Sequence, residues 1–373
     1  MYSSGIIGLI VVAGYSSRMG TFKPLMPLGE KKVIETAVDS LRLGGVKDIR
    51  VIVGHRAAEL YPVLERLPVS IIENPNYASG MFSSIVTGVS ALDAEAKAFM
   101  LLPGDTPLIR SSSIKELMKK YRQTGAAVVY PTFNGQRGHP PVISNKCFAS
   151  ILSGDGAGGL RHILEQFAAD SVVVPVADQG ILMDMDTLDD YQQLVKFYAK
   201  RNIPTYDECL ALLDKYQTGD KVLRHGQTVA AVAQQLVDLL TGAGLTLNSE
   251  LVVAGGLLHD LAKGKPNHPL RGGRLVTSNG FSALAGIVAA HMDLELTAEQ
   301  AIDEAAVLFL ADKLVQGNRR VSLNERFSLP LAKFSGDPEI LAAVLRRQQT
   351  AKIIRDRITG LVGIGSLEKL VLQ

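Results

Sequence analysis

The hydrophobic periodicity of the chain changes once, near residue 200. Before that point, short apolar runs such as GLIVVA at 8–13 and AFMLLPGD at 98–105 alternate with stretches of helical period. Alternation of this kind is typical of β-α-β units, whose right-handed crossovers build a mostly parallel sheet with helices on both faces. We therefore expect an α/β, Rossmann-like domain over residues 1–200.

The remainder of the chain has only helical period. The stretches GQTVAAVAQQLVDLLTGAG at 226–244 and AEQAIDEAAVLFLADKLVQG at 298–317 are examples. The segment Asn202-Ile203-Pro204 disfavours a continuous helix between the two halves. The chain has 373 residues, 47% of them hydrophobic, which is enough to build two cores. We expect a second, all-helical domain over residues 206–373.

The charge balance favours small-molecule partners. Lys+Arg number 39 against 37 Asp+Glu, a net charge of +2, so no field of one sign indicates nucleic acid or an anionic membrane as a partner. No apolar run approaches the roughly 20 residues that span a bilayer. The chain has 2 cysteines and opens with MYSSGIIGLI, which lacks a basic start and a cleavage site. We expect a soluble protein in the reducing cytoplasm.

The stretch IVVAGYSSRMGTFKPLM at 10–26 places a glycine-containing, cationic loop directly after an apolar run. Gly14 and Gly20 are spaced neither as in the phosphate loop of nucleoside triphosphatases nor as in the dinucleotide fingerprint. Glycines nevertheless let backbone N–H groups approach an anion, and Arg18 and Lys23 supply positive charge. The loop therefore indicates a polyphosphate site at the carboxyl end of a strand.

Carboxylates follow two later apolar runs. Asp105 stands in LPGDTPLI, and Asp184 and Asp186 stand in ILMDMDTLDDY. Carboxylates at strand ends, opposite Arg18 and Lys23, would share a magnesium ion with a triphosphate. The alternative is that Asp105 only caps a turn, since PGDTP also has good turn chemistry.

Five blocks in this order, VVAGYSSRMGTFKPL, NPNYASGMFSSI, LPGDTPLI, RGHPPVI and MDMDTLDDY, resemble the molybdenum cofactor nucleotidyltransferase family over about the first 195 residues. The resemblance implies catalytic roles for Arg18, Lys23 and Asp105, and Mg²⁺ held by Asp105 and Asp186, with Asp184 as a near alternative. It assigns nucleotide contacts to Ala13, Gly14, Ser16, Ser17, Arg18, Gly20, Lys23, Gly80 and Ser83. It places Gly138 and His139 on the acceptor side.

The reaction implied by the resemblance is transfer of CMP from CTP to the phosphate of molybdopterin, with release of pyrophosphate. Such a transfer needs positioning and charge neutralisation and no protein nucleophile. Ala13-Gly14 stands where the guanylyl-transferring branch usually has Gly-Gly, which favours cytidine. Molybdoenzyme maturation proteins are possible partners. The alternative acceptor is a sugar phosphate or another phosphorylated compound, because fold does not decide the substrate.

The helical half concentrates possible metal ligands. These are His225, His259, Asp260, His268, His291 and Asp312. An aspartate within the leucine-rich segment VLFLADKLV is costly to bury unless it is paired or bound to a metal. Mixed nitrogen and oxygen ligands suit Fe, Mn, Ni or Zn, and their number allows two ions bridged by Asp260. The alternative is a helical domain whose polar residues pair only with each other.

The segments RHGQTVAAVA, LLHDLAKG, AAHM and ADKLV resemble the HD superfamily of metal-dependent phosphohydrolases over about residues 206–330. The resemblance implies that His225, His259, Asp260 and Asp312 are ligands and that His268 and His291 match the extra histidines of its two-metal branch. It implies metal-assisted hydrolysis of a phosphoester or phosphoanhydride, with Lys263 contacting phosphate. An alternative is that this half senses nucleotides without turnover and regulates the transferase.

Overall fold

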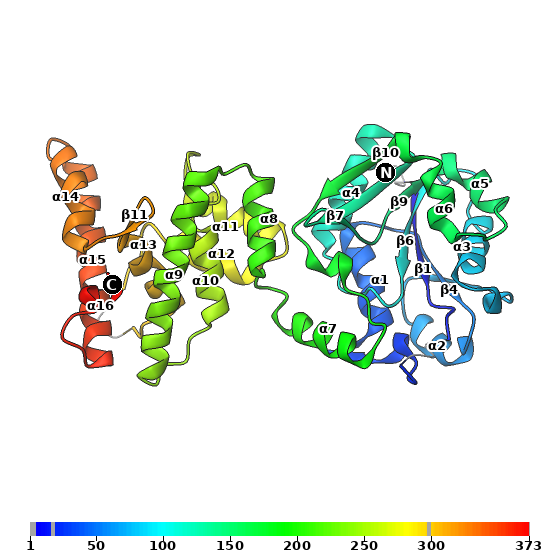
Figure 1. The fold of residues 1–373 in the computed structure, drawn as a ribbon, viewed down its shortest axis with the longest axis horizontal. Coiled ribbons are helices and arrows are strands. Elements are labelled where there is room, and N and C mark those ends of the chain that lie inside the picture. Colours follow the sequence, from blue (N-terminus) through cyan, green and yellow to red (C-terminus); the bar gives the residue numbers. More distant parts are fainter. Residues whose placement is uncertain (1–4, 16–18, 297–299, 373) are drawn as a thin grey trace. The chain divides into compact units, whose positions relative to one another are not determined.

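The computed structural model describes residues 5–15, 19–296 and 300–372. The chain divides into two compact units, Met1–Arg201 and Asn202–Gln373 (Figure 1). Each unit has its own secondary-structure class, in agreement with the change of hydrophobic period.

The first unit is built on an 8-stranded mixed sheet with the order β10-β7-β9-β6-β1-β4-β5, to which β8 adds by pairing with β7. The strands are β1 (Ile6–Val11), β4 (Ile49–Val53), β5 (Ser70–Glu73), β6 (Ala98–Pro103), β7 (Val128–Phe133), β8 (Gln136–Arg137), β9 (Val142–Ser144) and β10 (Ser171–Pro175). Strand β9 runs antiparallel to β6 and β7, and β8 runs antiparallel to β7, while the other pairs are parallel. The expected mostly parallel α/β sheet is confirmed.

Helices cover both faces of this sheet. They are α1 (Val33–Gly44), α2 (Ala57–Leu64), α3 (Met81–Ser90), α4 (Ser111–Thr124), α5 (Phe148–Leu152), α6 (Gly159–Glu165) and α7 (Leu188–Lys200). Helix α1 packs on α4, and α3 packs on α5 and α6. A short hairpin of β2 (Pro27–Leu28) and β3 (Lys31–Lys32) precedes α1.

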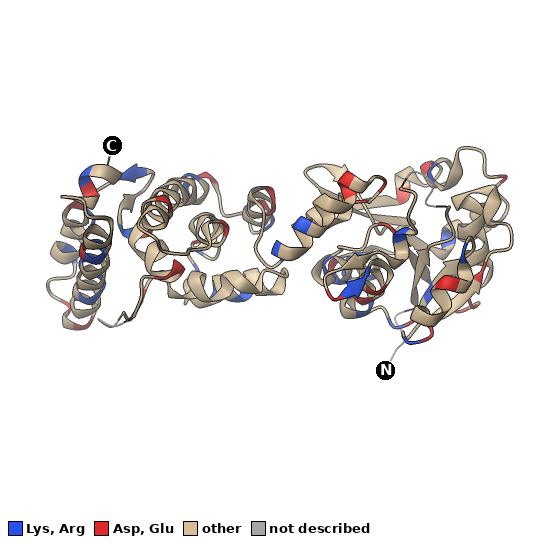
Figure 2. Ribbon diagram, turned by 90° about the horizontal axis from the view of Figure 1, so that it is seen from below, with Lys and Arg blue, Asp and Glu red and all other residues tan. Residues whose placement is uncertain are grey.

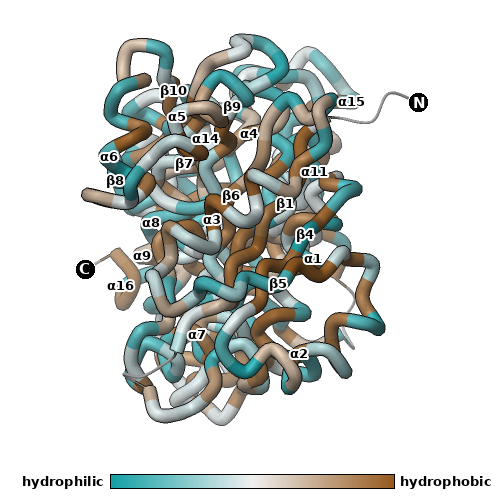
Figure 3. Tube along the Cα trace, turned by 90° about the vertical axis from the view of Figure 1, so that its right-hand side faces the viewer, coloured by the Kyte–Doolittle hydropathy of each residue, from teal (hydrophilic) through white to brown (hydrophobic). Residues whose placement is uncertain are grey.

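The central strand β1 is apolar throughout because it is covered on both sides. Ile7, Leu9 and Val11 belong to the hydrophobic core that includes Ile85 of α3. On the opposite face, a Cβ added to Gly8 would lie 2.8 Å from the side chain of Leu41 in α1. Figure 3 shows β1, β4 and β6 as a hydrophobic centre. Burial on both faces explains a continuous apolar run in place of alternation.

The second unit is mainly helical. Its helices are α8 (Tyr206–Lys215), α9 (Asp220–Gly242), α10 (Ser249–Leu258), α11 (His268–Ser278), α12 (Ala285–Ala290), α13 (Glu304–Lys313), α14 (Leu323–Lys333), α15 (Pro338–Val362) and α16 (Leu367–Val371). Helix α9 packs against α10 and α13. One element that the pattern did not indicate is a short antiparallel hairpin of β11 (Val315–Gln316) and β12 (Arg319–Arg320).

Side-chain caps fix where the helices of this unit begin. Asn248 accepts a hydrogen bond from Leu251 N at the start of α10, and Asp303 accepts one from Ala306 N at the start of α13.

Lys and Arg are interspersed with Asp and Glu along both units (Figure 2). Within the described ranges, the chain has no helix with the length and apolar character needed to cross a lipid bilayer.

Candidate functional site

A cavity of about 190 Å³ lies at the carboxyl ends of β1 and β6 in the first unit. The parallel register pairs Val11 with Pro103, so the turns after these two strands lie side by side. Gly104 N donates to Val11 O at 2.9 Å, and a Cβ on Gly104 would lie only 2.2 Å from Val12 Cγ1. Glycine at position 104 therefore allows the turn that carries Asp105 to approach the turn after β1.

The cavity is lined from both turns and from the start of α3. The lining residues are Val11, Val12, Ala13, Gly14, Tyr15, Lys23, Pro24, Tyr77, Gly80, Met81, Ser84, Pro103, Gly104 and Asp105. This position at strand ends is where open α/β sheets bind ligands. The structure thus brings the predicted residues Ala13, Gly14, Lys23, Gly80 and Asp105 to one cavity.

Lys23 links two aspartates that are far apart in sequence. Its Nζ lies 2.9 Å from Asp186 Oδ1 and 3.3 Å from Asp105 Oδ2. Its side chain is only 11% exposed, so the ammonium is held at the base of the cavity. The residue begins a short 3₁₀ turn, Lys23–Leu25, which fixes its backbone beside the strand ends.

A third carboxylate completes the acidic cluster. Partial burial raises the pKa of Asp184, and the negative charges of Asp105 and Asp186 raise it further. Lys23 thus contacts two of the carboxylates, and the third lies close enough for their charges to act on it. Clustered carboxylate oxygens are ligands that suit a hard divalent cation such as Mg²⁺.

We expected Asp184 and Asp186 to follow a strand. They instead follow a 3₁₀ turn, Gln179–Leu182. The segment Gly138-His139 holds this turn in place. His139 N donates to Ile181 O at 2.9 Å, and a Cβ on Gly138 would lie 2.4 Å from that same oxygen. The apolar run before Asp184 is therefore a turn that is buried under a loop. A buried turn needs apolar residues, so its sequence resembles that of a buried strand.

His139 lies near the acidic cluster and is not among the residues that line the cavity. Burial lowers its pKa, while the charges of Asp105 and Asp184 act in the opposite direction. Its Nδ1 is buried and has no hydrogen-bond partner among the described residues. This atom is available to a ligand or a water molecule.

Three aromatic rings that the sequence did not single out as a group meet at the cavity. The ring centroids of Tyr15 and His55 are 4.8 Å apart, those of Tyr15 and Tyr77 are 5.7 Å apart, and those of His55 and Tyr77 are 6.0 Å apart. Tyr15 and Tyr77 line the cavity. Flat rings at the edge of a cavity provide a surface on which a planar ligand can stack.

Other predicted residues are placed differently. The Ser83 hydroxyl donates to Asn76 O at 2.9 Å and Gly80 O at 2.8 Å, and Ser84 lines the cavity in its place. Gly20 has a φ of 66° and is not part of the lining. Ser16, Ser17 and Arg18 lie outside the described residues.

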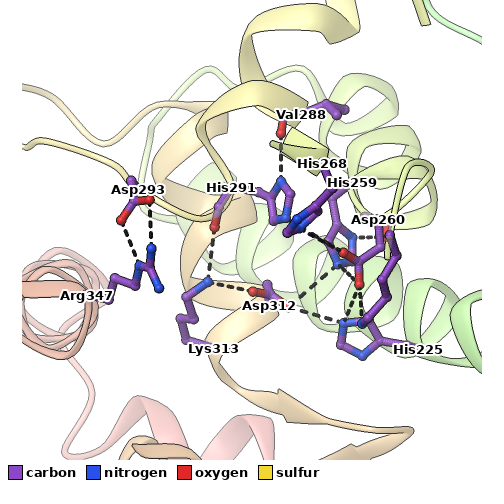
Figure 4. Close-up of polar contacts among 12 residues, drawn as sticks. His225, His259, Asp260, His268, Val288, His291, Asp293, Asp312, Lys313 and Arg347 are labelled. Atoms are coloured by element: carbon purple, nitrogen blue, oxygen red, sulfur yellow. Dashed lines mark hydrogen bonds and ion pairs between the residues drawn. The ribbon is translucent and has the colours of Figure 1, made fainter. Parts of the chain in front are cut away.

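The second unit brings all six predicted ligands together (Figure 4). Helix α9 carries His225, and His259 and Asp260 follow directly after α10. His268 begins α11, His291 follows α12, and Asp312 lies in α13. All except His268 are buried. Five segments thus converge on one buried polar cluster.

Backbone carbonyls orient three of the imidazoles. The Nδ1 atoms of His225, His259 and His291 lie 2.7 Å, 2.8 Å and 2.7 Å from the carbonyl oxygens of Gly317, Gly256 and Val288. A carbonyl only accepts, so Nδ1 carries the proton and Nε2 keeps a lone pair. The Nε2 atoms of His259 and His291 are buried without a hydrogen-bond partner in the described chain. This tautomer and orientation are those of metal-ligating histidines.

The carboxylate oxygens of Asp260 separate the ligands into two groups. Its Oδ2 lies 3.8 Å from His225 Nε2 and 3.5 Å from His259 Nε2. Its Oδ1 lies 3.5 Å from His268 Nε2 and 3.9 Å from His291 Nε2. Ligands bound at about 2.0–2.2 Å to one ion are about 3–3.5 Å apart. Each group therefore needs only a small contraction to hold an ion.

Asp312 completes the first group. Its Oδ1 lies 3.2 Å from His225 Nε2 and 3.6 Å from His259 Nε2. Its Oδ2 accepts a hydrogen bond of 2.6 Å from Lys313, which is 3% exposed and also donates to His291 O at 3.1 Å. Burial alone would raise the pKa of Asp312, but the positive charge of the neighbouring Lys313 opposes it, and the pKa is lowered. Asp312 is thus held ionised, as a metal ligand must be.

Comparisons with known proteins agree with this division. Residues 8–172 match the MobA-like NTP transferase domain, and residues 222–316 match the HD domain. Both resemblances that the sequence motifs indicated are therefore confirmed.

Curated relatives match the first half. The molybdenum cofactor cytidylyltransferase of Escherichia coli (strain K12) is 29% identical over 189 residues, which are 50% of this chain and 94% of that protein. The nicotine blue oxidoreductase of Paenarthrobacter nicotinovorans is 25% identical over 199 residues, 51% of this chain and 96% of that protein. A crystal structure from Mycobacterium sp. strain JC1 is 26% identical with a TM-score of 0.47, covering 54% of this chain and 100% of that one.

Proposed function

We propose that this enzyme, in which a MobA-like NTP transferase domain is joined to an HD domain, transfers CMP from CTP to the phosphate of molybdopterin and releases pyrophosphate. Two features support the choice of substrates. The cytidylyltransferase relative covers the first half of the chain, and Ala13-Gly14 lines the cavity at the position that favours cytidine.

The observation that carries the proposal is the placement of Lys23 between Asp105 and Asp186 at the cavity. Within the cavity, Lys23 binds the phosphates of CTP, and its charge offsets the charge that develops on the departing pyrophosphate. Arg18, whose position lies outside the described residues, is proposed to share this role. The chain's part in the reaction is to position the two substrates in line, with no covalent intermediate.

Asp105 and Asp186, with Asp184 beside them, are the residues that would hold Mg²⁺. When bound, the ion supplies charge neutralisation to the phosphate oxygens. A cation on these carboxylates would leave the Lys23 ammonium group free to bind the phosphates. Gly138 and His139 are proposed to lie on the acceptor side, where the unpartnered Nδ1 of His139 can bind the acceptor.

For the second unit we propose a metal-dependent phosphohydrolase. His225, His259, Asp260 and Asp312 would hold one ion, and Asp260, His268 and His291 a second, with Fe, Mn, Ni or Zn as the metals that suit these ligands. The metal supplies activation of water and polarisation of a phosphoryl oxygen. The buried cluster orients its own nitrogens toward Asp260, and Lys263 offers a cation at the same carboxylate, 2.6 Å from Oδ2.

The proposed domains are residues 1–200 for the transferase and 206–373 for the hydrolase. Possible further partners are molybdoenzyme maturation proteins. The acceptor that competes with molybdopterin is a sugar phosphate, since this family's fold also serves such reactions.

Pyrophosphate release from a matrix of substrates tests the proposal. The full chain is incubated with Mg²⁺, each nucleoside triphosphate in turn, and either molybdopterin or a sugar phosphate. We expect pyrophosphate only when CTP and molybdopterin are present together. Release with a sugar phosphate and without the pterin would replace the proposed acceptor and leave nucleotidyl transfer as the activity.

A further inference from the structure

A second cavity, of about 390 Å³, lies beside the histidine–aspartate cluster of the second unit. From its lining we infer that it binds a ligand with at least two linked phosphate groups, next to the metal centre. This inference rests on the proposed hydrolase function and names the substrate class of that site.

The walls of this cavity are continuous with the segments that carry the ligands. Val222 is one helical turn before His225 in α9, and Leu261 and Ala262 follow directly after Asp260. Arg271 is three residues after His268 in α11. A molecule in the cavity therefore lies against three of the five segments that carry the proposed metal ligands.

Lys263 connects the cavity to the cluster. It lines the cavity, and its Nζ lies 2.6 Å from Asp260 Oδ2, the oxygen that faces His225 and His259. Its side chain is 53% exposed, so the ammonium is open to the cavity as well as to the carboxylate. A phosphate bound at the Lys263 end of the cavity contacts Lys263 and lies next to the proposed metal ligands.

Two further cations line the same cavity without neutralising partners. Lys265 and Arg271 are exposed, and neither side chain makes an ion pair within the part of the chain that the structure describes. The described lining residues include no carboxylate. The cavity thus carries three positive charges, and only that of Lys263 is compensated. Uncompensated like charges at one cavity attract an anion.

The number of cations indicates more than one phosphate. A single phosphate at the metal end meets Lys263 and leaves Lys265 and Arg271 without an anion. A second phosphate gives them a partner, and the planar guanidinium of Arg271 can bind it with two parallel hydrogen bonds. The rest of the lining is mixed. It includes the apolar Val222, Leu261 and Leu275 and the polar Gln217 and Thr218, which suits an organic part with both apolar and polar groups.

Helix α11 offers a matched control for a test of this site. Arg271 and Arg274 are both exposed and lie one turn apart, but only Arg271 lines the cavity. Substituting Arg274→Ala therefore removes the same charge from the same helix without touching the site. Both variants use the full chain with Lys23→Met, which weakens phosphate binding at the transferase cavity equally in both.

Calorimetry with Mn²⁺ and two probes provides the test. Methylenediphosphonate, which is not hydrolysed, represents two linked phosphates, and orthophosphate represents one. We expect the diphosphonate to bind about tenfold or more tightly than orthophosphate, since each added charge-assisted contact is worth about one decade in affinity. Arg271→Ala should weaken diphosphonate binding about tenfold and leave orthophosphate binding unchanged, and Arg274→Ala should change neither.

Equal affinities for the two probes, or equal effects of Arg271→Ala and Arg274→Ala, would overturn the inference. A separate assay follows phosphate release from CMP, CDP and CTP. If the diphosphonate binds as expected and none of these is hydrolysed, the binding site stands and the proposed hydrolase activity fails. Hydrolysis of CMP with the same kcat/KM as CDP would contradict the preference for two phosphates.

Discussion

Lys23 and Asp186 are 163 residues apart in sequence, and the Lys23 ammonium lies 2.9 Å from an Asp186 carboxylate oxygen. This contact joins the turn after the first strand to the loop that precedes α7. Asp105 also contacts Lys23, so two carboxylates hold the ammonium group beside the cavity.

Substituting Lys23→Met should lower kcat/KM for pyrophosphate release by about 100-fold or more. Removing one positioned group that stabilises developing charge typically lowers the rate by such a factor. Steady-state measurement of pyrophosphate with CTP and molybdopterin checks this. Lys31→Met is the control, since Lys31 lies in the neighbouring hairpin and binds Asp39 outside the cavity. Equal activity of Lys23→Met and wild type would remove Lys23 from the mechanism.

Lys31→Met should instead lower stability slightly, in a pH-dependent way. The hydrogen bond to Asp39 raises the pKa of Lys31, and the hydrogen bonds from Lys31 and Arg42 outweigh burial and lower the pKa of Asp39. The stabilisation is therefore present between about pH 4 and pH 10, and is lost as pH falls through the lowered pKa of Asp39 or rises through the raised pKa of Lys31. Water screens this half-exposed pair, so we expect about 0.2–1 kcal/mol by urea unfolding at pH 7. A difference that persists at pH 2 would contradict this assignment.

The strands and the ligand-bearing segments were predictable because their signals are local. The predicted apolar run at residues 8–13 overlaps β1, Ile6–Val11, which is buried on both faces of the sheet. Helix α10 ends at Leu258, directly before His259 and Asp260, so the motif marks the end of its own helix.

The remaining parts depend on contacts that sequence does not display. The apolar residues before Asp184 form a 3₁₀ turn under Gly138-His139 and not a strand, because their burial comes from a distant loop. The ring contacts among Tyr15, His55 and Tyr77 join three segments that are separate in sequence. Similarly, the cations at positions 265 and 271 line one cavity together with Leu261 and Ala262, which the sequence pattern did not indicate.

Gly138→Ala should destabilise the first unit and reduce its activity together. The new Cβ would lie 2.4 Å from Ile181 O, so the turn that leads to Asp184 and Asp186 must move. Overpacking of this kind costs about 1–3 kcal/mol. Gly242→Ala is the control, since a Cβ there meets nothing within 4 Å. Thermal unfolding and pyrophosphate release measure the two effects, and an unchanged Gly138→Ala protein would contradict the proposed support of the acidic loop.

Metal analysis of variants tests the bridging role of Asp260. After loading with Mn²⁺ and removal of the excess, Asp260→Ala should retain neither ion, because its two oxygens face the two groups of histidines. His268→Ala should retain one ion, since His268 belongs only to the second group. His162→Ala, at a histidine of α6 outside the cluster, should match wild type.

Two results of that analysis would contradict the account. Full metal content in Asp260→Ala would exclude it as a shared ligand. Identical content in His268→Ala and wild type would exclude the second ion.

The most direct test of the central claim follows the α-phosphorus of CTP. The full chain is given Mg²⁺, molybdopterin and CTP labelled at that phosphorus, and the products are separated and counted. We predict that the label appears in a cytidine–pterin dinucleotide, with one pyrophosphate for each molecule formed, and that Lys23→Met forms far less. Label that stays in CTP, or that appears only as CMP, in the presence of molybdopterin would contradict nucleotidyl transfer to this acceptor.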